Sequence, residues 1–235
     1  MAKYFNVGSN TFADDFKAAL ESYYGDGVTI ESASGNTVVF QCPMVCDKVL
    51  KIMCAASGTR AYIGDSSSSM VQFSNSYDGA TEGLHVILSE SFILIDTQAT
   101  GGRRNSSLMA RLSNGRYMVV GGLLDNETYD AYLGNNKGCF TYDMVLRPIR
   151  MVTPYTTNAK SNGKMCLFPS YVLDNDEVEL NADGTFADIP GLWLTTTRGA
   201  PVVGSNYYLS QSGLRGLSSE GQYCYTQKYV ELEMD

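Results

Sequence analysis

Short apolar runs recur along the middle of this chain, and their lengths predict β-strands. The stretch from Gly83 to Gly122 contains four of them, at Leu84–Leu88, Phe92–Asp96, Leu108–Leu112 and Tyr117–Val120. The first two are almost continuous in aliphatic and aromatic residues, which is typical of strands covered on both faces. The third alternates, so its neighbours are expected on opposite faces of a sheet. The pattern predicts an antiparallel meander at the centre of the fold.

An Asn-Gly pair, Asn114 and Gly115, stands between the last two runs. Such a pair favours a type I′ turn, because both central residues of that turn need a positive φ. We therefore expect a tight hairpin at this point.

One segment has helical periodicity instead. Its apolar stripe recurs every three or four positions, at Phe12, Phe16, Leu20 and Tyr23 or Tyr24. Thr11 is the expected N-cap, with Asp14 closing a weak capping box, and Gly25 ends the helix. The spacing predicts a helix over about 12–24 that packs its aromatic stripe on a sheet.

The flanking pattern completes the expected fold. Strand pairs are expected at 28–31 with 37–41 and at 48–55 with 59–63, followed by a polar loop over 65–80 with one short strand near Met70–Phe73. Five of the six prolines lie beyond residue 147. We predict a mainly β fold, an antiparallel meander, sandwich or set of barrel-like sheets, with one N-terminal helix. Residues 1–26 are its first strand and helix, packed on the sheet. Residues 27–235 form a β-rich domain, either as one unit or as two lobes divided near 147–150.

Composition and charge restrict the partners. The chain has 235 residues, a net charge of −8 and only 18% charged residues, with 16 Tyr and 23 Gly. A negative surface repels phosphate backbones, which argues against sequence-specific nucleic-acid binding. The basic pair Arg103-Arg104 is more typical of a solvated loop than of a nucleic-acid contact. Tyr and Gly suit both β-structure and protein contacts.

The first residues have no apolar stretch like that of a secretion signal, and no run approaches the ~18 residues that cross a bilayer. We expect a protein made in the cytoplasm, without a membrane partner. The six cysteines are too sparse for a disulfide framework. The spacing of Cys42, Cys46 and Cys54 does not match a zinc knuckle, and small buried side chains are the expected role. Pairing of these thiols or a bound metal stays open, and no cofactor is predicted.

Candidate catalytic residues are few. His85 is the one histidine, and it lies inside an apolar run. A hydrolase would have to use it as the base, with Asp65, Asp78 or a serine as partner. No nucleophile motif supports that reading, and a strand histidine with one hydrogen bond is the simpler one. Tyrosines gather near the end of the chain, at Tyr207, Tyr208, Tyr223, Tyr225 and Tyr229. Sheet packing, protein contacts or a sugar platform would each use them.

Two segments near the end carry a resemblance. PGLWLTTTRG at 190–199 and SEGQYCYTQKYVELE at 219–233 resemble the endings of virion structural proteins of tailed bacteriophages, and the central meander is similar to theirs. The resemblance implies a non-enzymatic β-rich subunit of the head–tail connector, tail or tail tip. Such a subunit is made in the host cytoplasm and contacts copies of itself and neighbouring virion proteins.

The expected function is therefore a structural subunit of a bacteriophage particle that acts through symmetric contacts. The residues expected at interfaces are Arg103, Arg104, Asp65, Ser66, Tyr223, Tyr225 and Tyr229. A carbohydrate- or receptor-binding module at a tail tip, with a glycan partner, is one alternative. A hydrolase that uses His85 is the other.

Overall fold

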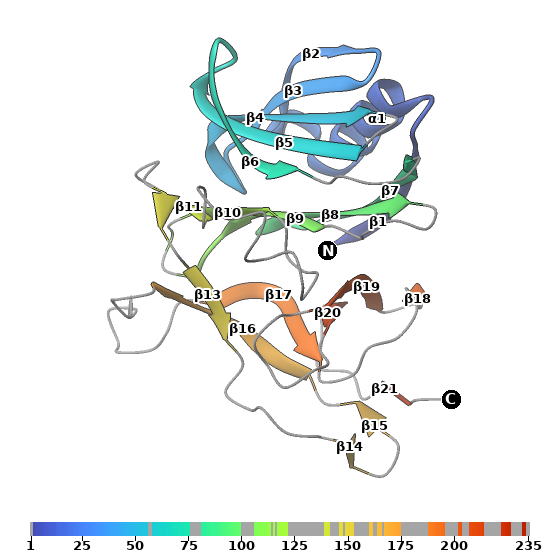
Figure 1. The fold of residues 1–235 in the computed structure, drawn as a ribbon, viewed down its shortest axis with the longest axis vertical. Helices are drawn as coiled ribbons and strands as arrows, with labels where there is room; N and C mark the ends of the chain where they lie inside the picture. Colours follow the sequence, from blue (N-terminus) through green and yellow to red (C-terminus); the bar gives the residue numbers. More distant parts are fainter. Residues whose placement is uncertain are drawn as a thin grey trace.

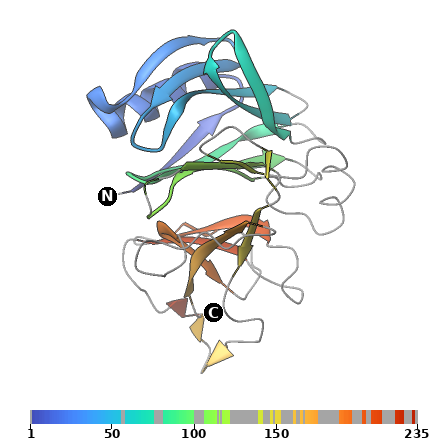
Figure 2. The same ribbon diagram turned by 90° about the vertical axis from the view of Figure 1, so that its left-hand side faces the viewer.

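A computed structural model of the chain describes residues 2–55, 58–75, 81–99, 106–113, 115, 117–121, 139–141, 146–147, 149–152, 160–161, 164–165, 167–174, 188–195, 202–203, 207–213, 222–226 and 232–233. This part of the chain is mainly β, with antiparallel sheets and a single α-helix near the N-terminus, as predicted. Three sheets are stacked on one another (Figures 1 and 2). None of the helices in the described residues is long and apolar enough to cross a bilayer.

The outer sheet is a continuous antiparallel meander in the order β2-β3-β4-β5-β6. Its order equals the chain order because each strand turns directly into the next. It forms the upper layer in Figure 1, above the middle sheet. Its strands are β2 (Thr29–Ser34), β3 (Thr37–Cys42), β4 (Cys46–Ala55), β5 (Gly58–Ser66) and β6 (Ser69–Asn75).

The middle sheet contains the predicted central meander, extended by the first strand of the chain. Its order is β1-β7-β8-β9-β10-β11-β12, so the N-terminal strand lies at one edge. The strands are β1 (Lys3–Gly8), β7 (Thr81–Leu88), β8 (Phe92–Ala99), β9 (Ser106–Arg111), β10 (Tyr117–Gly121), β11 (Cys139–Thr141) and β12 (Leu146–Arg147).

The third sheet lies on the other side of the middle sheet (Figure 2) and has the order β13-β16-β17-β20-β19-β18. Its strands are β13 (Ile149–Val152), β16 (Leu167–Asp174), β17 (Asp188–Thr195), β18 (Val202–Val203), β19 (Tyr207–Gly213) and β20 (Gln222–Thr226). A small sheet holds β14 (Lys160–Ser161), β15 (Lys164–Met165) and β21 (Leu232–Glu233).

The middle sheet is buried on both faces, as its continuous apolar runs predict. Val86 and Ile95 are register partners in the core that faces the outer sheet. Ile87 and Leu94, the next pair along, point to the opposite face and are also buried. On that side the hydroxyl of Ser91 donates to the carbonyl of Pro190 in β17 at 2.8 Å. Burial on both faces explains why alternation is absent from these strands.

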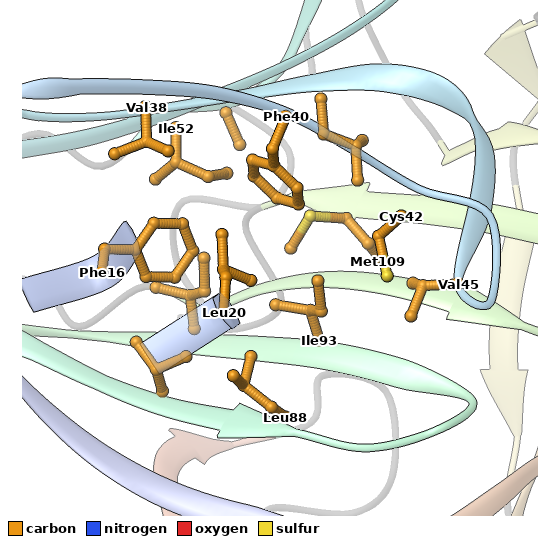
Figure 3. Close-up of a cluster of buried hydrophobic side chains, with 14 of the residues drawn as sticks. Phe16, Leu20, Val38, Phe40, Cys42, Val45, Ile52, Leu88, Ile93 and Met109 are labelled. Atoms are coloured by element: carbon orange, nitrogen blue, oxygen red, sulfur yellow. The ribbon is translucent and has the colours of Figure 1, made fainter. Parts of the chain in front are cut away.

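The predicted helix is α1 (Phe12–Tyr24), followed by a short 3-10 turn at Gly25–Gly27. Phe12, Phe16 and Leu20 are fully buried, which confirms that the aromatic stripe packs on the sheets. The ring of Phe16 meets that of Phe40 edge-on at 5.9 Å. Figure 3 shows Phe16 and Leu20 among side chains from the outer and middle sheets, including Phe40, Ile52, Ile93 and Met109. A buried Phe or Leu of this kind stabilises the fold by about 1.5–3 kcal/mol.

Three local predictions were wrong. Thr11 occupies the N-cap position as predicted, but its hydroxyl donates to the carboxylate of Asp15 at 2.5 Å and the expected capping box with Asp14 does not form. Asp65 and Ser66 belong to β5 and Ser69 begins β6, so the first part of the expected polar loop is a tight turn, while the short strand expected near Met70–Phe73 is confirmed within β6. The N–H of Gly115 donates to the carbonyl of Leu112, so Gly115 ends its turn instead of occupying its centre.

Candidate functional site

His85 lies in β7 beside the edge strand β1, and Tyr4 is its neighbour there. The Tyr4 hydroxyl is 2.6 Å from Nδ1 of His85, and the two rings are tilted by 31° with centroids 5.7 Å apart. The histidine is half-buried, and this desolvation lowers its pKa below 6.5. The imidazole is therefore neutral at pH 7. His85 thus lies in a strand and is held by a hydrogen bond, as the simpler interpretation expects.

A buried carboxylate lies next to this pair. Asp96 in β8 is the register partner of His85, and it is 1% exposed. Burial, and secondarily the charge of Asp96, raise the pKa of Tyr4. Continuing the same rung, Asn6 is opposite His85 and Ser106 is opposite Asp96. Asn6, His85 and Asp96 thus form a polar row on the face where the next rung holds the buried residues Ile87 and Leu94.

A phenol, a neutral imidazole and a carboxylate can hold or transfer a proton. Of the partners considered from sequence, Asp65 lies in another sheet, where it forms an ion pair with Lys48, and Asp78 lies outside the described residues. Tyr4 and Asp96 were missed. The signal for Asp96 was present, because a hairpin that pairs Leu88 with Ile93 also pairs His85 with Asp96.

Arg111 joins two hairpins from different sheets. Its guanidinium donates to both carboxylate oxygens of Asp47, at 2.6 and 3.2 Å. It also donates to the carbonyls of Pro43 at 2.6 Å and Gly115 at 2.8 Å. This contact lowers the pKa of the Asp47 carboxyl and raises that of Arg111. These contacts, which we call the Arg111 clamp, have a structural role, because the N–H donors of the guanidinium are bound by acceptors within the protein.

The cysteines of the first half are buried thiols. Cys42 and Cys46 are register partners across β3 and β4, and Cys54 lies farther along β4. Burial raises their pKa values to about 11 for Cys42, about 12 for Cys46 and about 11 for Cys54. Within the described part of the chain no group of His, Cys, Asp and Glu is placed to hold a metal ion. Burial and a raised pKa are typical of cysteines that pack in a core, and not of reactive or metal-binding thiols.

The predicted interface residues do not come together in the described structure. Asp65 and Ser66 lie at the end of β5, where the hydroxyls of Ser66 and Ser68 are 3.0 Å apart. Tyr223 and Tyr225 lie in β20, where their register partners in β17 are Leu194 and Leu192. Arg103, Arg104 and Tyr229 lie outside the described residues.

A surface that the sequence reasoning missed lies on the outer sheet, on the face away from the core. Lys51 and Tyr62 are register partners there, with the ammonium 4.1 Å from the ring centroid. The next rung on this face pairs Met53 with Arg60. All four side chains are partly exposed. We call this group, Lys51, Met53, Arg60 and Tyr62, the cation–aromatic patch. Its signal in the sequence is the alternation of these residues with buried Ile52 and Ala61.

No protein-family model matches the chain, and no curated protein matches it either.

Proposed function

We propose that this chain is a non-enzymatic structural subunit of a bacteriophage particle, at the connector, the tail or the tail tip. It would function by binding copies of itself and neighbouring virion proteins. The observation that carries the proposal is the open outer sheet. Among the described strands, β2 and β6 each pair on one side only, and the outer sheet, which holds the cation–aromatic patch, is the outermost layer in Figures 1 and 2.

Unpaired strand edges, and a sheet face with both charged and aromatic side chains, are suited to protein–protein assembly. An unpaired edge can accept a strand from a neighbour through main-chain hydrogen bonds. Tyr, Arg and Met, three of the four patch residue types, are enriched at protein interfaces. The place in a bacteriophage particle is supported by the resemblance of 190–199 and 219–233. These two segments contribute β17 and β20, which are adjacent strands of one sheet.

The experiment is a search for the protein in purified particles. Particles from cultures that produce the chain are banded on a density gradient, and their proteins are identified and quantified by mass spectrometry. The proposal expects the chain in the particle band at a fixed ratio to the other structural proteins. Recovery only in the soluble fraction, with none in the particles, would contradict it.

The Tyr4–His85 contact beside Asp96 favours a second candidate, a hydrolase with His85 as general base. Here Tyr4, His85 and Asp96 would supply the hydroxyl, the base and the carboxylate. The test is ester hydrolysis by the wild type and by His85→Ala, with folding of both followed by circular dichroism. Activity that disappears in a folded His85→Ala variant would support this candidate and count against the structural role. Equal rates in both proteins would exclude it.

A further inference from the structure

The cation–aromatic patch carries positive charge on a molecule whose net charge is −8. Lys51 and Arg60 form no ion pair with any other residue that the structure describes. Lys51 instead stacks on Tyr62, which orders the ammonium group and the ring together. The four side chains form two adjacent rungs of one strand pair, so they present a single continuous surface.

This surface is preorganised for a partner. It stands on β4 and β5, which are held by strands on both sides, so the sheet fixes its spacing. Val39 and Val49 lie beside the patch on the same face of the sheet. They are 7% and 4% exposed, so apolar side chains border the patch. Tyr and Arg are among the residue types that contribute most to binding at protein interfaces, especially where apolar side chains surround them. Its charge selects a partner that bears carboxylates.

The described part of the chain contains a surface of the opposite charge. The solvent face of α1 and the turn after it carry Asp14, Asp15, Glu21 and Asp26, all exposed, against a single cation at Lys17. Lys17 is 3.7 Å from Glu21. Asp14 and Asp26 form no ion pair with other described residues. This acidic face of α1 is distinct from the patch, because α1 packs on the inner side of the outer sheet.

We propose that the cation–aromatic patch of one copy binds the acidic face of α1 on a second copy. This inference rests on the proposed structural function and names the contact through which copies assemble. Lys51 and Arg60 would meet the carboxylates of Glu21 and Asp26, while Tyr62 and Met53 pack on the helix between them. Because the two surfaces are different parts of the molecule, the contact builds a ring, a chain or a reciprocal dimer.

The first experiment reverses the charge of the patch in the full chain. Native mass and sedimentation are measured for the wild type, for Lys51→Glu/Arg60→Glu and for the matched control Lys3→Glu/Lys48→Glu, which changes the net charge equally. We expect the wild type and the control to associate and the patch variant to associate at least tenfold more weakly. Association of the wild type should weaken as salt rises. Circular dichroism and thermal melts verify that each variant is folded.

The second experiment restores the contact with exchanged charges. Glu21→Lys/Asp26→Lys should also lose association alone, since it removes the other half of the contact. Mixing it with Lys51→Glu/Arg60→Glu restores two complementary contacts, one between the native patch and the native helix face and one between the two reversed surfaces, so we expect association in which the two variants alternate at a 1:1 ratio. If the patch variant associates like the wild type, or if the mixture stays monomeric, this inference is wrong while the structural function can stand. A wild type that is monomeric throughout overturns this inference, and its absence from purified particles as well would overturn both.

Discussion

The hydroxyl of Tyr4 lies 2.6 Å from Nδ1 of His85, and this contact joins the edge strand β1 to its neighbour β7 in the middle sheet. Asp96 is the register partner of His85 on the other side, so the only histidine of the chain lies between a phenol and a buried carboxylate. The sheet holds this group rigidly, which makes its protonation a sensitive measure of the fold.

We expect the pKa of His85 in the folded protein to lie below 6.5, because burial disfavours the charged imidazolium. Between the folded and unfolded pKa values the unfolded chain binds more protons. The native state therefore loses stability as pH falls below about 6.5, until the folded pKa is passed. NMR titration measures this directly, since one histidine gives one curve. His85→Gln should show less pH dependence in the same window. A pKa above 6.5 for His85 in the folded protein would contradict the burial of its imidazole.

Replacing Arg111 with Lys should lower the free energy of unfolding by about 1–2 kcal/mol, because a lysine cannot reproduce a bidentate bond to a carboxylate and two further carbonyl contacts. Asp47 is largely exposed, so most of the loss should come from the carbonyls of Pro43 and Gly115. Denaturant unfolding checks the value. The matched control is Arg60→Lys, which has no such contacts and should change stability by less than about 0.5 kcal/mol. Equal effects of the two substitutions would contradict the clamp.

Gly64→Ala should destabilise the β5–β6 hairpin strongly. A Cβ atom at Gly64 would lie 1.9 Å from the carbonyl oxygen of Ser69, so the backbone must shift. The expected loss is about 1–3 kcal/mol or more in thermal or denaturant unfolding. Gly27→Ala is the control, because its Cβ would lie 3.3 Å from the flexible Met44 side chain and 3.9 Å from the Cβ of Tyr24, which is an ordinary van der Waals contact. A neutral Gly64→Ala would show that the hairpin is more open than described.

The buried thiols should resist alkylation in the native protein. Cys42, Cys46 and Cys54 have pKa values raised to about 11, about 12 and about 11 by burial, so little thiolate is present at pH 8. We expect iodoacetamide to leave all three unmodified within an hour and to label them in denaturant, as read by peptide mass spectrometry. Rapid native labelling of any of the three would contradict its burial.

Much of the first half of the fold could be predicted from sequence. The helix at 12–24 and the strand runs at 84–88 and 92–96 were found because burial dictates their apolar periods. The Asp65–Ser69 segment was misjudged because serines suit tight turns as well as loops, and only pairing of β5 with β6 decides between them.

The candidate sites were harder to predict, since both depend on contacts between distant residues. Tyr4 and His85 are separated by 81 positions in the chain and meet only because β1 joins the edge of the meander. Lys51 and Tyr62 are close in sequence, but alternation alone does not show that their face is the uncovered one. That information comes from the stacking of the sheets, which no local pattern encodes.

The central claim is that this chain functions by assembling with copies of itself or with neighbouring virion proteins. The most direct measurement is the native mass of the full-length protein across micromolar concentrations at physiological salt, by native mass spectrometry and analytical ultracentrifugation. The account predicts a defined multiple of the 25.6 kDa chain that dissociates on dilution or at high salt. A single 25.6 kDa species at every concentration, together with its absence from purified particles, would contradict it.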